Sequence, residues 1–146
     1  MKKKIKLYDS TLRDGAQTKG VNFSLNDKLK IISLLDEIGI DYIEGGWPGA
    51  NPTDNVFFQK LPKLRNSKAV AFGMMRKFGK SSQNDSGLNA VLNSGVSTVC
   101  LVGKSWDFHV KNALKIPLNK NLDMISDTIA FASKRVDEVL FDAEHF

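Results

Sequence analysis

The stretch that decides the fold is Lys4-Ile5-Lys6-Leu7-Tyr8-Asp9-Ser10-Thr11-Leu12-Arg13-Asp14-Gly15-Ala16-Gln17, residues 4–17. Residues 4–8 alternate polar and apolar side chains, which is typical of a β-strand with one buried face. The alternation breaks at Asp9, and the segment from there to Gln17 carries two carboxylates, a guanidinium and an amide. We therefore expect a strand whose carboxyl end opens into a loop of reactive side chains.

This unit of strand and polar loop repeats along the chain, with helical patterns between the repeats. Further strands are predicted at residues 41–44, 69–73, 98–102 and 139–142. The first helix is predicted to start at an N-cap, Ser24, with Asp27 three residues on, and to stop at Gly39. A second is predicted to be capped by Thr53 or Asp54 and to reach Leu61. The later helices are predicted around residues 88–92, 105–114 and 119–134.

Alternation of strand and helix with short connections predicts parallel strands with helices outside them. An open doubly wound sheet and a (β/α)8 barrel both satisfy this pattern. The length favours the open sheet, because a full barrel takes roughly 250 residues. The polar residues favour the barrel, because nearly every strand ends in them, and barrel active sites draw on several strands at one rim. The rim residues expected after the third, fourth and fifth strands are Arg76, Lys104, and Asp142 with Glu144 and His145. We predict the α/β fold of an N-terminal portion, about five β/α units, of a (β/α)8 barrel.

Composition excludes several other classes of protein. The 146 residues are 42% apolar and 25% charged, which is the balance of a globular domain and not of a disordered chain. The single cysteine, Cys100, excludes a disulfide framework within the chain. No apolar stretch is long enough to cross a membrane, and the basic start lacks the apolar region of a signal peptide, so we expect a cytoplasmic protein. The net charge of +5 is spread along the chain, and neither an aromatic-interleaved basic run nor a nucleotide-binding glycine motif accompanies it, so no nucleic-acid partner is expected.

Two segments carry the chemistry. In the first, Asp14 offers a hard oxygen ligand for a divalent cation, and Arg13 offers a fork for a carboxylate or an oxyanion. A surface Arg–Asp pair would explain the same two residues. The second segment runs from Ile43 through Glu44 to Pro52, and its three glycines, two prolines and one tryptophan predict a shaped loop. Glu44 ends its strand at the rim where we expect Arg13.

These two segments resemble the DRE-TIM metallolyases, a family of acyl-CoA condensing and cleaving enzymes. The family motif is Asp9-Ser10-Thr11-Leu12-Arg13-Asp14-Gly15, with Glu44 in the second strand. The loop Gly45-Gly46-Trp47-Pro48-Gly49 and the segments around residues 103–110 and 142–146 are closer to the branch that forms citramalate from acetyl-CoA and pyruvate. Synthases acting on other 2-keto acids, acyl-CoA lyases, and a non-catalytic half-barrel binding module remain alternatives.

The resemblance implies an acyltransferase of isoleucine biosynthesis that works on a small 2-keto acid. It implies that Asp14 binds a divalent cation (Mg, Mn or Zn), that Arg13 stabilises the keto-acid oxygen, and that Glu44 orients Arg13 or a water. It further implies that Gln17 lines the pocket and that Glu144 contacts the keto acid. Acetyl-CoA is the implied co-substrate, and a homodimer is the implied assembly. We expect Asp9 to be a loop-capping carboxylate.

The sequence departs from the family pattern in one respect. The family supplies two further metal ligands from a His-x-His pair, whereas the histidines of this chain are His109 and His145. We expect both to be structural or supporting residues. We therefore predict that residues 1–146 are a partial catalytic domain, cut before the later strands, and that this polypeptide alone is inactive.

Overall fold

The structure, a computed structural model, describes residues 5–146 and is built on one parallel sheet. The strands are β1 (Tyr8–Asp9), β2 (Tyr42–Gly46), β3 (Lys68–Met74), β4 (Thr98–Lys104) and β5 (Glu138–Glu144). The helices are α1 (Leu25–Glu37), α2 (Pro52–Gln59), α3 (Ser86–Leu92), α4 (Asp107–His109) and α5 (Leu118–Ala132). Three short helical turns complete the secondary structure: the 3₁₀ turns η1 (Gly15–Gln17) and η2 (Ser82–Asn84) and the π turn η3 (Val110–Leu114).

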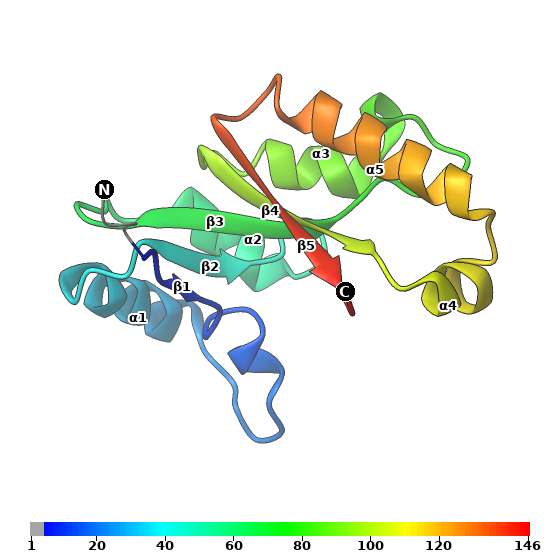
Figure 1. Cartoon of the computed structure of the whole chain (residues 1–146). Coiled ribbons are helices and arrows are strands. Elements are labelled where there is room, and N and C mark those ends of the chain that lie inside the picture. The colour runs from blue at the N-terminus through cyan, green and yellow to red at the C-terminus, as the bar shows by residue number, and fades with distance from the viewer. Residues whose placement is uncertain (1–4) are drawn as a thin grey trace.

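The order of the strands decides between the two predicted architectures. All neighbours are parallel, and the order in the sheet is β1-β2-β3-β4-β5, the order of the chain itself. An open doubly wound sheet reverses its strand order at a switch point, whereas a barrel winds in one direction. The one-way winding leaves the main helices outside the sheet, with β1 and β5 at its two edges (Figure 1). The prediction of a partial (β/α)8 barrel is confirmed.

Alternation along the strands divides the apolar residues between two faces. The outer face packs against α1, α2, α3 and α5 and forms the larger core, in which Ile43, Phe57, Val91 and Leu101 are almost fully buried. The inner face, which would line a closed barrel, is smaller. It consists of Tyr42, Val70, Phe72, Cys100 and Val102, with Trp47 and Leu140 packed against them.

A polar network closes the inner face at the amino ends of the strands. Lys6 Nζ donates to the Tyr42 hydroxyl at 2.9 Å, and that hydroxyl donates to Glu138 Oε1 at 2.9 Å. Lys68 Nζ donates to the other carboxylate oxygen of Glu138 at 2.9 Å. This hydrogen bond outweighs the opposing effect of burial and, with Tyr42, holds the pKa of Glu138 below its usual value. These contacts occupy the amino end of the inner face, which leaves the opposite, carboxyl rim open for functional side chains.

Two sequence predictions of element boundaries are wrong, and each has a local cause. The first strand was expected at residues 4–8 but is Tyr8–Asp9, because the N–H of Leu7 donates to the Asp41 carboxylate at 2.9 Å instead of extending the strand; Lys4 lies outside the described residues. The second helix is capped by Asn51, whose side chain accepts from the Thr53 N–H, and not by Thr53 or Asp54. Pro52 occupies the first helical position, where its missing N–H costs nothing.

The first helix follows its prediction. Ser24 and Asp27 form the reciprocal capping box, and Gly39, at φ +83°, reverses the chain after the C-cap. Among residues 5–146, no helix combines the length and the apolar character that a membrane crossing requires.

Candidate active site

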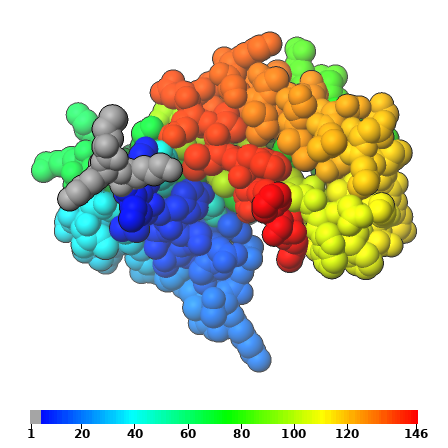
Figure 2. Space-filling view, viewed as in Figure 1, coloured from blue at the N-terminus to red at the C-terminus, as the bar shows by residue number. Residues whose placement is uncertain are grey.

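The loop after β1 is folded by its own polar groups. The Asp9 carboxylate accepts from the N–H and the hydroxyl of Thr11, both at 3.0 Å, so Asp9 caps the loop as expected. The carbonyl oxygen of Ser10 accepts from the N–H groups of Arg13 and Asp14 at 3.1 and 2.8 Å. Figure 2 shows the rest of the β1–α1 loop projecting from the body of the molecule, with residues 17–22 exposed. Arg13 and Asp14 therefore sit in the ordered base of this loop.

The guanidinium of Arg13 is held on two sides. Its Nε forms a hydrogen-bonded ion pair with Glu44, and its Cζ lies 3.9 Å from the centroid of the Phe72 ring. The other oxygen of Glu44 accepts from the Tyr8 hydroxyl. The Glu44 side chain is only 2% exposed, so both of its oxygens are committed to these partners. The structure thus brings Arg13 and Glu44 together, with Glu44 orienting the guanidinium.

Two neighbouring groups stay protonated beside this ion pair. Burial, followed by the hydrogen bond to Glu44, raises the pKa of Tyr8, so its hydroxyl remains a donor to the carboxylate. Burial also raises the pKa of the Cys100 thiol to about 11. Neither group is charged near neutral pH, so neither adds a charge beside the Arg13–Glu44 pair.

Asp14 stands at the open side of the same group. One of its oxygens lies 3.3 Å from Arg13 Nη1, and its side chain is 63% exposed. A hard, exposed carboxylate beside the rim suits one position in the shell of a divalent cation. Within residues 5–146, no cluster of three or more His, Cys, Asp or Glu residues could hold a metal ion. The described residues could therefore supply one ligand, Asp14, to a divalent cation.

The loop after β2 is shaped by close contact with α2. Gly46 has a φ of +150°, and a Cβ there would lie 2.4 Å from Asp54 Cγ, so only glycine fits. Asp54 accepts from the Trp47 N–H at 2.8 Å, and the Trp47 ring meets the Phe72 ring edge-on at 5.4 Å. A cavity of about 260 Å³ lies over this loop and is lined by Arg13, Gln17 and Trp47, among others.

Glu144 lies at the end of β5, where its direct partners are two neighbouring side chains. It forms an ion pair with Lys104, and His145 Nε2 lies 3.7 Å from its Oε1. The hydrogen bond from Lys104 outweighs burial and lowers the pKa of Glu144. The His145 ring packs edge-on against His109 at 4.7 Å, and His109 packs beside Trp106. Glu144 thus belongs to a second group on the rim, joined through Lys104 to β4.

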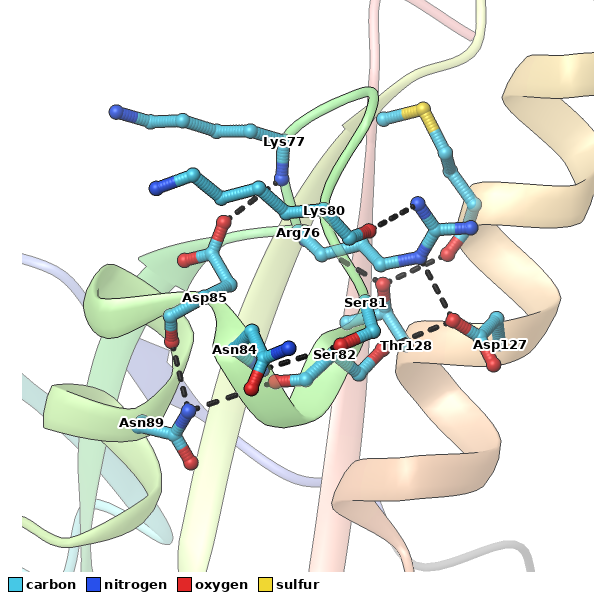
Figure 3. A network of polar contacts seen from close by, with 11 residues as sticks. Arg76, Lys77, Lys80, Ser81, Ser82, Asn84, Asp85, Asn89, Asp127 and Thr128 are labelled. Atoms are coloured by element: carbon cyan, nitrogen blue, oxygen red, sulfur yellow. Dashed lines mark hydrogen bonds and ion pairs between the residues drawn. The ribbon is translucent and has the colours of Figure 1, made fainter.

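A larger cavity of about 530 Å³ opens beside the first, along the ends of β3 and β4. Trp47 lines both cavities. The β3–α3 loop at its edge is braced by polar contacts, shown in Figure 3. Arg76 Nε pairs with Asp127 at 2.7 Å, and the Lys77 N–H donates to Asp85 at 2.9 Å. The Arg76 side chain, which we expected at the rim, therefore has a structural role: its guanidinium joins this loop to α5.

Sequence reasoning missed three contributors to the site. Tyr8 and Phe72 read as ordinary strand residues, and only the register of the sheet shows that both reach Glu44 or Arg13 from the inner face. The burial of Lys28 could have been inferred from the sequence, because this lysine interrupts the apolar stripe of the first helix at a position that faces the core. Its 4% exposure and its ion pair with Asp54 confirm that it is buried.

Comparison with known proteins gives both a family and a fold. A family model described as HMGL-like matches residues 4–146. An (R)-citramalate synthase of Aquifex aeolicus is 50% identical over the whole chain, which spans 28% of that protein. A 2-isopropylmalate synthase of Caldanaerobacter subterraneus is 34% identical over 97% of the chain and 35% of that protein. The crystal structure of a hydroxymethylglutaryl-CoA lyase from Pseudomonas aeruginosa matches 94% of the chain and 45% of its own, with a TM-score of 0.71 and 19% identity.

Proposed function

The chain belongs to the HMGL-like family, and from that membership we propose that it is the N-terminal part of a citramalate synthase. The observation that carries this choice is the 50% identity with a citramalate synthase over the whole chain, against 34% with a 2-isopropylmalate synthase. The chain spans 28% of the citramalate synthase, so the remaining strands of the barrel would come from a longer protein. The lyase neighbour supports the fold alone.

The proposed reaction joins two carbon atoms. Acetyl-CoA loses a proton from its methyl group, and the resulting enolate carbon attacks the keto carbon of pyruvate. The carbonyl π-electrons move to oxygen, which becomes an alkoxide and is protonated. Water then cleaves the thioester, giving citramalate and free CoA. Negative charge grows on the keto oxygen during attack, and a preorganised cation beside it lowers the barrier.

Arg13 is the residue that would meet this charge. Its guanidinium is fixed by Glu44 and by the Phe72 ring before substrate arrives, so it needs little reorganisation when the alkoxide forms. Arg13 lines the cavity of about 260 Å³, where a small 2-keto acid would bind. Gln17 lines this cavity and would contact the keto acid.

Glu144 and the larger cavity complete the proposed site. Glu144, kept ionised by Lys104, would accept a hydrogen bond from the keto acid or its product. The apolar cavity of about 530 Å³, separated from the first by Trp47, has room for the acyl arm of acetyl-CoA.

Asp14 would hold a divalent cation of the Mg, Mn or Zn type, together with ligands from outside the described residues. When bound, such a cation supplies Lewis-acid polarisation of the keto group. Since one carboxylate seldom holds a catalytic cation firmly, we propose that residues 1–146 alone are inactive and that the full-length protein is the enzyme. A cytoplasmic homodimer is the proposed form of that protein.

The test is release of free CoA thiol by the full-length protein with a panel of 2-keto acids. We expect acetyl-CoA to be consumed fastest with pyruvate. Preference for a branched keto acid would move the protein to the isopropylmalate synthases, and no thiol release with any keto acid would favour a binding module. Cleavage of an acyl-CoA in place of condensation would make it a lyase.

A further inference from the structure

A buried ion pair outside the proposed reaction lies next to the Arg13 site. Lys28, on α1, and Asp54, in the first turn of α2, are both 4% exposed and form a hydrogen-bonded ion pair. Lys28 Nζ also lies 5.1 Å from the centroid of the Phe57 ring. A buried pair adds little net stability compared with apolar residues of the same size, so its presence calls for another account.

The pair is connected to the site through one tryptophan. Asp54 gives one oxygen to Lys28 and the other to the Trp47 N–H, at 2.8 Å. The same carboxylate packs where a Cβ of Gly46 would lie, which fixes the chain two residues after Glu44. The Trp47 ring then meets the Phe72 ring edge-on at 5.4 Å.

Phe72 is the surface on which the Arg13 guanidinium lies. The contacts therefore run without a gap from the ion pair, through Trp47 and Phe72, to Arg13. Lys28, Asp54, Trp47 and Arg13 also line one cavity, of about 260 Å³. Trp47 is at the same time a wall of the larger cavity, so its placement sets the boundary between the two.

We propose that Lys28 and Asp54 are positioning residues for the keto-acid site, which act by holding Trp47 against Phe72 and so fixing the plane of the Arg13 guanidinium. This inference rests on the proposed function for the identity of the substrate. Displacement of a reacting group by about 1 Å can lower the rate by about 10²-fold. A change at Asp54 that shifts Trp47 would therefore displace Arg13 and lower the rate.

The test compares two buried carboxylates of the full-length protein, Asp54 and Asp36. Asp54→Asn keeps the side-chain shape but removes the charge that holds Lys28. Asp36→Asn is the matched control, because Asp36 is 7% exposed and accepts backbone N–H groups of Arg65, Asn66 and Ser67, which precede β3 at the opposite end of the sheet. We expect Asp54→Asn to lower kcat/KM for pyruvate by about tenfold to a hundredfold. We expect Asp36→Asn to lower the stability and leave kcat/KM unchanged.

A second readout does not depend on turnover. Residues 1–146 contain two tryptophans, Trp47 and Trp106, so the signal of Trp47 is taken in a Trp106→Phe background as the difference from the matching Trp47→Phe variant. We expect acrylamide to quench Trp47 more strongly after Asp54→Asn and equally after Asp36→Asn. If Asp54→Asn does not fold, Lys28→Met carries the same test, since it removes the other half of the pair.

The outcomes separate the two proposals. Equal kcat/KM and equal quenching for the Asp54 and Asp36 variants would overturn the positioning role. Absence of turnover in the unmodified protein would overturn the proposed function instead, and the quenching comparison would still decide whether Asp54 holds Trp47.

Discussion

The contact between Glu44 and Arg13 gives the sharpest prediction. Glu44→Gln keeps the shape of the side chain but replaces one acceptor oxygen by an NH2 group. That group would face either the Tyr8 hydroxyl or Arg13 Nε, both of which are donors. One charge-assisted hydrogen bond is lost and one donor is left without an acceptor. The guanidinium also loses the counter-charge that holds it over the Phe72 ring.

The size of the effect follows from burial. Loss of a hydrogen bond to a charged group costs about 1.5–3 kcal/mol, and breaking a fully buried ion pair costs about 3–5 kcal/mol. Glu44 is 2% exposed and Arg13 is 18% exposed, which places this pair between the two cases, at about 3 kcal/mol. If all of this is lost in the transition state, kcat/KM for pyruvate falls by about 10²-fold, because each tenfold corresponds to about 1.4 kcal/mol.

The assay is CoA release by the full-length protein at varied pyruvate. Glu138→Gln is the control, because Glu138 has the same kind of partners, a tyrosine hydroxyl and a cation, at the amino end of the sheet. We expect this control to keep the kcat/KM of the unmodified protein. A Glu44→Gln variant as active as Glu138→Gln would refute the assignment of Arg13 and Glu44 as a working pair.

Three further predictions follow from single contacts. Gly46→Ala should destabilise the protein by roughly 2–4 kcal/mol in urea unfolding, because the new Cβ would combine a φ of +150° with a 2.4 Å clash against Asp54. Gly20→Ala, at φ +84° with nothing within 4 Å, should destabilise the protein less, and an equal loss of stability would contradict the role of the clash. Asp14→Asn should weaken divalent-cation binding to the full-length protein by at least about tenfold in calorimetric titration, and an unchanged affinity would remove Asp14 from the ligands. The hydrogen bond from Lys68 lowers the pKa of Glu138 from 4.5. The stability that ionised Glu138 contributes is therefore complete above pH 4.5 and is lost as the pH falls through the lowered pKa. Glu138→Gln should make the free energy of unfolding less dependent on pH in this acid range, and an unaltered dependence would show that other carboxylates cause it.

The sequence predicted the partial barrel and placed Arg13 and Glu44 at the same rim. Parallel strands bring their carboxyl ends to one rim, so residues that follow different strands can be placed together without coordinates. The strand order then removed the one ambiguity that length had left, between an open sheet and a barrel.

Other parts of the site depend on details that periodicity does not encode. The register of β2 against β3 shifts between Glu44 and Gly46, and this irregularity sets where Trp47 meets Phe72. The Tyr8 hydroxyl reaches Glu44 on the neighbouring strand, two residues beyond its register partner Tyr42, which no local pattern indicates. The Lys28–Asp54 pair joins two helices, and its burial depends on how those helices pack.

The central claim is that Arg13 acts on the charge that develops on the keto acid. The most direct measurement is kcat of the full-length Arg13→Ala variant at saturating pyruvate and acetyl-CoA. Arg65→Ala serves as the control, because Arg65 is exposed and precedes β3, at the end of the sheet opposite the rim. We predict that Arg13→Ala abolishes turnover, a loss of at least about 10³-fold, while the control retains it. Turnover by Arg13→Ala equal to that of the control would contradict the account.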